Sequence, residues 1–472
     1  MVLEYPRPFV WDWLKDFGAD GYQPFPWQAE HIHGRSENRI IAACGRRSGK
    51  STAIVAEAWR ELTQPPDLVA GVEHQPLVYI IAPNYELTMR VWEPFVKSCI
   101  SDPTSSNAPI LSELVTSYNK ERRLIELKTG ARIQAKSADN EVSLQGDRVT
   151  AAIIDEAHDV ADSARNEFMP ALTDAKGRLI AIGVPQSNNW FRSYWERGQS
   201  TLHEDNDYYS FSVPTTANPS IDPIVVEEAR LEYPEIEFRQ RFLAEWAESE
   251  GKVFKNIDDC FNGKLQPWVK GKHYLMGLDI AKQHDYTVAY IIDIKDMAIV
   301  ASDRFNGLSY TALGPRIASM YQEYKCQTIH LDATGVGEAV KDILVDEGCH
   351  ITSFKFTTQS KAQLVSTLVA EVEHKRVHFP YDDEQLRREL KLFEGKVMAG
   401  GNIQYSAPPG YFDDCVMAAG LAVLLAKQRQ PRKINMNNKY LTFSNTQKRK
   451  ISNSKYLNFN NTNKRRFLTG VA

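Results

Sequence analysis

The stretch Cys44-Gly45-Arg46-Arg47-Ser48-Gly49-Lys50-Ser51 decides how the first half of this chain folds. It follows an apolar run at 39–43, which predicts a buried parallel strand, and it precedes a segment of helical periodicity that begins at Thr52. A strand, a glycine-containing turn, Gly-Lys-Ser and a helix together form the context of a phosphate-binding P-loop. In that context, backbone N–H groups and the helix N-terminus face the phosphates.

The P-loop interpretation gives each side chain a role. Lys50 is expected to reach the β- and γ-phosphate oxygens of ATP, and the hydroxyl of Ser51 to ligate Mg²⁺. Cys44 occupies the position of the usual first glycine, so a chance Gly-Lys-Ser at a helix start is the competing interpretation until a second motif is found. The predicted nucleotide-binding positions are Gly45, Arg46, Arg47, Ser48, Gly49, Lys50, Ser51 and Thr52.

The second motif is an apolar strand that ends in two acids, Ile153-Ile154-Asp155-Glu156. We expect this strand to lie beside the P-loop strand, with Asp155 holding Mg²⁺ and Glu156 polarising the attacking water as the general base. The string continues as Ala157-His158, which invites comparison with DEAH-type helicases. Such helicases need a second RecA-like domain with a glutamine–arginine motif, and we find none downstream. His158 is interpreted as a local hydrogen-bonding residue.

Two further polar positions are candidates for contacts with the nucleotide. Gln28, in an aromatic and proline-rich segment before the P-loop, can present its amide to adenine, although on this signal alone a surface turn is the better explanation of the segment. A strand at 178–183 is followed by Gln186 and Ser187, either of which can sense the γ-phosphate.

Length and composition favour a protein of two or three domains. The chain has 472 residues, of which 43% are hydrophobic and 25% charged, with no apolar run of membrane-spanning length and no signal peptide. Its six cysteines are scattered without a Cys-x-x-Cys pair, which favours reduced thiols in a cytosol. Residues 427–472 hold twelve Lys and Arg and no Asp or Glu, so this tail is either an arm for an acidic partner or a solvated segment.

A second set of acids begins at residue 273. Asp279 lies within a predicted strand at 273–281, two antiparallel strands and a helix at about 310–325 follow, and Asp332 ends a further strand. The last helix opens at Asp413-Asp414. This order of strands, helices and acids is that of an RNase H-like nuclease, in which carboxylates hold two divalent metals about 4 Å apart. Asp279, Asp332 and one of Asp413 or Asp414 are the predicted ligands, with His284 and Asp285 as secondary candidates.

These motifs in this order resemble the large terminase subunit of tailed bacteriophages, from about residue 22 to residue 424. The resemblance implies an α/β fold with an N-terminal RecA-like P-loop ATPase domain and a C-terminal RNase H-like nuclease domain. It also implies that Arg46 contacts the γ-phosphate and that Gln28 binds adenine. Two positions depart from the family pattern: Val184 replaces a Thr or Ser before Pro185, and Phe412 replaces a His before the last acid pair.

The resemblance further implies a DNA-packaging motor that uses ATP and Mg²⁺ in one domain and two Mg²⁺ or Mn²⁺ ions in the other. The expected partners are double-stranded DNA, the portal protein of the procapsid, a small terminase subunit and further copies of the chain in a ring, commonly a pentamer. No membrane is involved. The expected location is the host cytoplasm, transiently at the portal vertex and not in the mature virion.

We therefore predict an ATPase domain at 1–250, a linker at 251–271, a nuclease domain at 272–426 and a basic tail at 427–472. Two alternatives remain at this point. One is a DEAH-like helicase or nucleic-acid-dependent ATPase, and the other is a non-catalytic capsid-assembly or DNA-binding protein. The acids and Lys50 that catalysis requires are all present, which argues against the second alternative.

Overall fold

The structure is a computed structural model of the whole chain. It describes residues 22–69, 71–100, 110–186, 189–199, 207–246, 253–280, 286–332, 336–397, 403–408 and 410–430.

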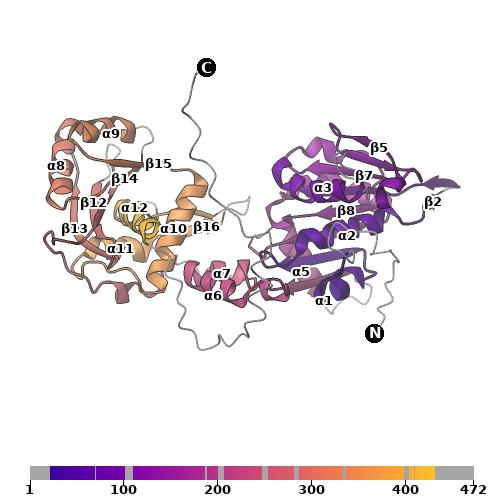
Figure 1. The fold of residues 1–472 in the computed structure, drawn as a ribbon, viewed down its shortest axis with the longest axis horizontal. Helices are drawn as coiled ribbons and strands as arrows, with labels where there is room; N and C mark the ends of the chain where they lie inside the picture. Colours follow the sequence, from indigo (N-terminus) through magenta and orange to yellow (C-terminus); the bar gives the residue numbers. More distant parts are fainter. Residues whose placement is uncertain are drawn as a thin grey trace, which may run out of the picture. The chain divides into compact units, whose positions relative to one another are not determined.

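An eight-stranded sheet organises the first half of the chain (Figure 1). Its order is β10-β1-β9-β8-β4-β7-β6-β5; the pairs from β10 to β7 are parallel, and β7, β6 and β5 pair antiparallel. Consecutive parallel strands need helical crossovers, which is why the apolar strands alternate with helices in the sequence. The strands are β1 (Arg39–Cys44), β4 (Leu77–Ala82), β5 (Val115–Asn119), β6 (Leu124–Leu127), β7 (Arg132–Ser137), β8 (Ala151–Ile154), β9 (Arg178–Gly183) and β10 (Tyr208–Val213).

The expected neighbour of the P-loop strand was wrong. β9 lies between β1 and β8, because β9 pairs with β1 on one side and with β8 on the other. The acids that follow β8 nevertheless come close to the P-loop. Parallel strands end at the same edge of a sheet, and the side chains of Asp155 and Glu156 are long enough to span the end of the intervening strand.

Helices cover both faces of this sheet, and strand alternation divides its core in two. Ile40 and Ile80 pack on the face of α2 and α3, whereas Ile41 and Ile81 pack on the face of α4 and α5. The helical segments of the first half are α1 (Pro26–Gln28), η3 (Ala29–His33), α2 (Lys50–Leu62), α3 (Tyr85–Cys99), η4 (Ile110–Leu114), η5 (Glu141–Leu144), η6 (Ala157–Asp159), α4 (Asp162–Asp174), α5 (Trp190–Gln199), η7 (Thr215–Ala217), α6 (Pro223–Glu232) and α7 (Glu235–Arg241). A small hairpin adds β2 (Asp67–Val69) and β3 (Val72–His74).

A buried ionic cluster joins α2 to the start of β9. The Arg178 guanidinium donates to Glu57 and Glu61 at 2.7 Å each, and the ring Nδ1 of His33 lies 2.7 Å from Glu57. Arg60 also pairs with Glu57. Burial opposes ionisation of Glu57, but the two guanidiniums outweigh it and lower its pKa to about 2. The cluster ties the segment before the P-loop to the helix after it.

The end of α7 is fixed by contacts with other segments of the first half. α7 ends at Arg241, and Ala244 has a left-handed φ of 58°. The backbone carbonyls of Arg241 and Phe242 accept hydrogen bonds from the amides of Arg46 and Thr215, at 2.7 and 2.8 Å. The helix therefore ends where its last carbonyls accept hydrogen bonds from other segments of the chain.

A five-stranded sheet organises the second half, in the order β13-β12-β11-β14-β15. β11 pairs antiparallel with β12 and parallel with β14. This arrangement is the RNase H-like order expected from the sequence, and it is not a second RecA-like sheet. The strands are β11 (Tyr274–Asp279), β12 (Thr287–Asp293), β13 (Ala298–Phe305), β14 (Ile329–Asp332) and β15 (Ile351–Phe354).

Helices also sandwich this second sheet. Leu275 and Tyr290 pack on the face of α10, α11 and α12, whereas Met276 and Ile291 pack on the face of α8 and α9. The remaining elements are η8 (Ile257–Cys260), α8 (Tyr310–Glu323), α9 (Val336–Asp346), α10 (Thr358–Glu373), α11 (Glu384–Leu392), α12 (Asp414–Arg429) and the hairpin β16 (Glu394–Val397) and β17 (Ile403–Ser406). Phe254, Ile257 and Phe261, from the predicted linker, pack into the core beside α10 and α11.

All six cysteines are free thiols with buried side chains, as expected from their spacing. In the described parts of the chain, no helix combines the length and the apolar character needed to span a bilayer.

The contact between β11 and α12 provides a test of the second core. A Cβ on Gly277 would lie 2.3 Å from the carbonyl oxygen of Ala418 and 2.4 Å from the amide of Ala422. Because helix backbone cannot yield as a side chain can, Gly277→Ala is expected to destabilise the chain by about 3 kcal/mol.

The measurement is the melting temperature of Gly277→Ala, compared with that of Gly348→Ala as a control. A Cβ on Gly348 meets open space at a φ of 82°, so only the backbone cost of about 1 kcal/mol is expected there. Equal melting temperatures for the two variants would contradict the packing of α12 on β11.

Candidate nucleotide site and candidate metal centre

The P-loop joins the end of β1 to the start of α2. Gly49 has a φ of 105°, and a Cβ there would lie 2.9 Å from the Phe25 ring and 3.0 Å from the amide nitrogen of Gln28. Glycine is required at this position by both its conformation and this close approach. Lys50 is the first residue of α2, and Ser51 and Thr52 follow in its first turn, so the helix N-terminus faces the P-loop.

Other segments hold the outer turn of the P-loop in place. The amide of Arg46 donates to the carbonyl of Arg241 at 2.7 Å, and the hydroxyl of Thr215 donates to the carbonyl of Arg46 at 2.8 Å. A Cβ on Gly45 would lie 2.7 Å from the amide of Thr215 and 2.8 Å from the carbonyl of Phe242. Glycine is therefore needed at position 45 for the close approach of Thr215 and Phe242, although the preceding residue, Cys44, replaces the usual first glycine.

Arg46 and Arg47 differ in backbone conformation, and both side chains are exposed. Arg47 has a left-handed φ of 60°, and its carbonyl accepts a hydrogen bond from Asn218 at 2.7 Å. The positive charge of Arg46 makes a small contribution to the lowered pKa of Glu156.

An ion pair joins the P-loop lysine to the predicted general base. Lys50 Nζ donates to the two carboxylate oxygens of Glu156, at 3.1 and 3.2 Å. Burial alone would raise the pKa of Glu156, but Lys50 and His158 lower it below its ordinary value. Burial would likewise lower the pKa of Lys50, but Glu156 and Asp155 raise it. Glu156 is therefore an ionised carboxylate paired with Lys50.

The environment of Asp155 opposes ionisation of its carboxyl group, unlike that of Glu156. Its side chain is buried at the end of β8, and burial and the nearby Glu156 raise its pKa to about 6 despite the opposing charge of Lys50. A divalent cation at this carboxylate would supply the positive charge that Lys50 only partly provides. Asp155 and the Ser51 hydroxyl are oxygen donors of the kind that Mg²⁺ binds, so the residues fit the expected ion.

His158 connects the acids to the end of β9. Its Nδ1 accepts from the amide of Val184 at 3.2 Å and lies 3.6 Å from Glu156, while its Nε2 lies 3.4 Å from Asp159. Burial lowers the pKa of the ring, which keeps it neutral and able to accept at Nδ1. The interpretation of His158 as a local hydrogen-bonding residue is confirmed by these contacts. They also link Glu156 to the turn that carries Gln186.

Most of the hydrogen-bonding capacity of the Gln28 side-chain amide is taken up by partners within the protein. Its Oε1 accepts from the hydroxyl of Tyr22 at 3.0 Å and from the amide of Phe25 at 2.7 Å, and its Nε2 donates to the carbonyl of Gly49 at 3.0 Å. A glutamine that reads adenine in a bidentate manner needs a free acceptor. The adenine contact of Gln28 stays a prediction, and it requires at least one of these bonds to break.

Of the two predicted γ-phosphate sensors, Gln186 is described, and Ser187 lies outside the described residues. The amide of Gln186 donates to the carbonyl of Val184 at 2.9 Å, which places it in the turn that His158 contacts.

The second set of acids gathers at one edge of the five-stranded sheet. Asp279 is the last residue of β11 and not its centre, as the longer predicted strand had placed it, and Asp332 is the last residue of β14. β11 and β14 are paired in parallel with Leu278 opposite Leu331, so the two acids end adjacent strands. Gly277 packs on α12, and Asp279, two residues later, lies on the same face of its strand.

Asp413 and Asp414 reach this edge from the start of α12. Asp414 is the first residue of the helix, and its carboxylate accepts from the amide of Tyr286 at 3.0 Å. Burial raises the pKa of Asp279 well above its ordinary value, and the charges of Asp414, Asp413 and Asp332 raise it further. Asp279 is therefore influenced by the charges of the other three acids at this edge of the sheet.

A set of mutually repelling carboxylates fits hard divalent cations, whose preferred ligands are oxygens. Asp279, Asp332, Asp413 and Asp414 are the residues that would hold such ions. Among the residues that the structure describes, no three Asp, Glu, His or Cys side chains already stand at metal-binding separations, so bound ions would have to draw the acids together. His284, Asp285 and the basic tail lie outside the described residues.

Lys361 is the residue of this centre that sequence reasoning missed. Its Nζ donates to Asp413 at 3.2 Å, and its charge opposes the rise in the pKa of Asp279. A lysine in the first turn of an amphipathic helix gives no signal in the sequence that would distinguish it from a solvated residue.

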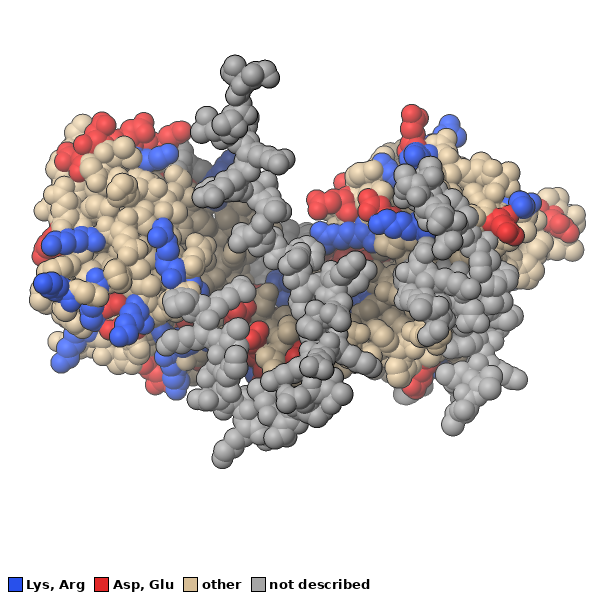
Figure 2. Space-filling model, viewed as in Figure 1, with Lys and Arg blue, Asp and Glu red and all other residues tan. Residues whose placement is uncertain are grey.

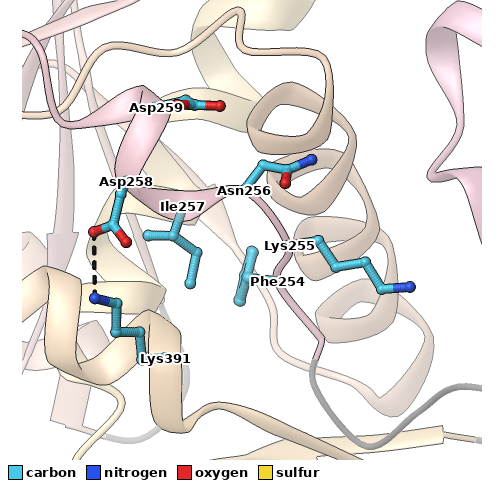
Figure 3. A pocket seen from close by; sticks show the side chains of 7 residues that line it. All are labelled: Phe254, Lys255, Asn256, Ile257, Asp258, Asp259 and Lys391. Carbon is cyan, nitrogen blue, oxygen red and sulfur yellow. Dashed lines mark ion pairs between the residues drawn. The ribbon is translucent and has the colours of Figure 1, made fainter.

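A separate pocket of about 630 Å³ lies where η8 meets α11 (Figure 3). Its lining includes Phe254, Ile257 and Asn256, together with Lys391, which pairs with Asp258 at 3.2 Å. None of its lining residues belongs to the acid cluster or the P-loop. The pocket therefore adds nothing to either site.

Comparison with known proteins identifies relatives of both halves. Residues 41–258 match the family model of the N-terminal part of the terminase large subunit, T4likevirus-type, and residues 276–425 match that of the terminase RNaseH-like domain. Proteins named "Terminase, large subunit" from Thermus phage G20c and Thermus virus P23-45 are each 29% identical over 445 residues. Each match covers 86% of this chain and 88% of the relative.

A solved structure supports the fold over nearly the whole length. The large terminase of a thermophilic bacteriophage matches with a TM-score of 0.57 and 13% identity, covering 89% of this chain and 99% of that one. The same protein in complex with ADP matches with a TM-score of 0.55 and 14% identity, covering 88% of this chain and 98% of that one.

The crowding of acids around Asp279 predicts a stability effect that depends on pH. Because the pKa of Asp279 is raised in the folded state, folding favours its neutral form. The contribution of this protonation to folding stability is fully present below the ordinary aspartate pKa. That contribution is lost as the pH rises through the raised value. Asp279→Asn removes the repelled charge, so its melting temperature at pH 8 without metal is expected to exceed that of the wild type by about 2 °C or more.

Differential scanning fluorimetry measures this difference. It should shrink as the pH is lowered, and Mn²⁺ should stabilise the wild type more than the variant. A variant that melts below the wild type at pH 8 in a chelator would refute the view that Asp279 is destabilised by its neighbours.

Proposed function

Because this chain belongs to the phage terminase large-subunit family, we propose that it is an ATP-driven motor that moves double-stranded viral DNA into an empty procapsid and cuts concatemeric DNA. The observation that supports the proposal is that two sheets of one chain each carry, at one edge, charged side chains of the kinds that ATP hydrolysis and metal-dependent DNA cleavage need. The first is Lys50 with Asp155 and Glu156, and the second is the acid cluster around Asp279.

In the first centre the residues divide the work of ATP hydrolysis. Lys50 binds the β- and γ-phosphates, and Arg46 contacts the γ-phosphate from the outer turn of the loop. Bound Mg²⁺ neutralises phosphate charge, and Ser51 and Asp155 would hold it. The nucleotide and Glu156 compete for Lys50, so binding of ATP releases Glu156. The freed carboxylate then accepts a proton from the attacking water as the general base.

In the second centre the residues prepare a site for cleavage of a DNA phosphodiester. Two divalent ions would supply an activated water and stabilise the leaving 3′ oxygen. Asp279 and Asp332, at the ends of paired strands, together with Asp413 or Asp414, would hold them. Asp414 is oriented by the amide of Tyr286. Cleavage therefore depends on carboxylates and not on a protein nucleophile.

The partners follow from the family: double-stranded DNA, the portal protein, a small terminase subunit and further copies of this chain in a ring, with the portal vertex as a transient location. The surface charge bears on the path of the DNA. Exposed acids gather over α9, including Glu338, Asp342 and Asp346, as Figure 2 shows on one face. A polyanion is repelled by such a surface, so we place the DNA away from α9.

The sharpest test of the ATPase assignment uses Lys50→Ala and Glu156→Ala. Each is expected to reduce DNA-stimulated ATP hydrolysis about 100-fold or more, because one removes phosphate binding and the other the general base. Glu167→Ala, at a half-buried position of α4 where the carboxylate accepts from Gln145, is the control and should hydrolyse ATP normally. Normal turnover by Glu156→Ala would refute the base assignment. Mn²⁺-dependent DNA cleavage should persist in every one of these variants.

The complementary test uses Asp332→Asn in the same preparations. We expect plasmid cleavage in Mn²⁺ to fall about 100-fold or more, because a metal ligand is lost, while ATP hydrolysis is retained. Asp342→Asn, on the exposed side of α9, is the control and should cleave as the wild type does. Unimpaired cleavage by Asp332→Asn would exclude this acid from the nuclease centre.

A further inference from the structure

A lysine is built into the acid cluster of the second sheet. Lys361, in the first turn of α10, donates to Asp413 at 3.2 Å. The lysine side chain is 30% exposed and its partner carboxylate 27% exposed, so the pair borders solvent at the mouth of the cluster. The same ammonium acts on Asp279, since it opposes the rise in the pKa of that acid.

The fold holds Lys361 in this place through two features. Thr357 and Ser360 form a capping box that starts α10 directly before Lys361. One turn later, Leu364 packs so closely on Gly420 of α12 that a Cβ on the glycine would lie 2.2 Å from it. α10 and α12 therefore pack together at their second turns, and Lys361, one turn earlier in α10, donates to Asp413 directly before α12.

The charges of the cluster do not balance. Three carboxylates, those of Asp414, Asp413 and Asp332, raise the pKa of Asp279, and Lys361 is the lysine that opposes them. An ammonium is a single positive charge on a flexible stem, so it can be exchanged for another cation. Divalent ions that neutralise Asp413 would also repel the ammonium, because like charges at this range cost free energy.

We infer that Lys361 is a DNA-binding residue of the nuclease centre, which Asp413 holds while metal is absent and which contacts a phosphate of the bound strand once metal ions occupy the acids. The inference rests on the proposed nuclease function. A displaced ammonium would bind a phosphate at this place, because each nucleotide of the DNA substrate carries one phosphate in its backbone.

This assignment makes two opposite predictions for Lys361→Ala. Removing the ammonium removes a competitor of the metal, so Mn²⁺ should bind the DNA-free protein about threefold more tightly or better. The same change removes a phosphate contact, so plasmid cleavage at saturating Mn²⁺ should fall about tenfold. Lys361→Arg keeps the charge and should restore both properties to within about threefold of the wild type. A lysine that only stabilises the helix would not produce opposite changes.

The experiment uses the full chain without nucleotide. Isothermal titration with Mn²⁺ measures binding, and Asp279→Asn serves as the blank that identifies heat from the nuclease centre. Plasmid cleavage is measured on the same preparations. Lys391→Ala is the matched control, because Lys391 forms a lysine–aspartate pair of the same 3.2 Å length at the separate pocket. It should change neither quantity.

The outcomes separate the two hypotheses. Weaker or unchanged Mn²⁺ binding by Lys361→Ala, or unchanged cleavage, overturns the role of Lys361 while the nuclease assignment stands. A wild-type protein that shows neither cleavage nor Mn²⁺ heat sensitive to Asp279→Asn overturns the nuclease function, and the inference with it. Tighter binding together with slower cleavage supports both.

Discussion

Charge held at the carboxyl edge of a sheet is the constraint on which both centres depend. In the first sheet Asp155 and Glu156 follow a fully buried strand, and in the second Asp279 ends a strand whose other residues are buried. Carboxylates at such positions are costly unless a positive charge is near. One lysine meets this need in each centre, Lys50 at 3.1 Å from Glu156 and Lys361 at 3.2 Å from Asp413.

The two lysines give the centres a common physical logic. A lysine balances only part of the negative charge, as the raised pKa values of Asp155 and Asp279 indicate. Under the proposed function, the remaining negative charge favours the binding of divalent cations, and in the first centre a nucleotide would compete for Lys50.

The fold directs these side chains through strand alternation and helix packing. Alternation places Gly277 and Asp279 on the face of their strand that α12 covers, and the glycine lets the helix approach. In the first sheet, the P-loop is held on its outer side by Arg241 and Thr215, and on its inner side by Phe25 and Gln28. The loop that binds phosphate is thus contacted by segments on both sides of it in the sequence.

The sequence by itself predicted the strands that precede Gly-Lys-Ser and the acids, the two classes of sheet, and Lys50 and the acids as site candidates, because apolar runs ending in such residues are local patterns. It did not predict β10, which lies in a stretch interpreted as helices and loops. Only the tertiary structure decided that β9 separates β1 from β8. It also decided that the Gln28 side-chain oxygen accepts hydrogen bonds from Tyr22 and Phe25, and that Lys361 pairs with an acid of the second centre. Strand order and ion pairs between distant residues depend on which surfaces pack together. That packing is a long-range property, and no local pattern records it.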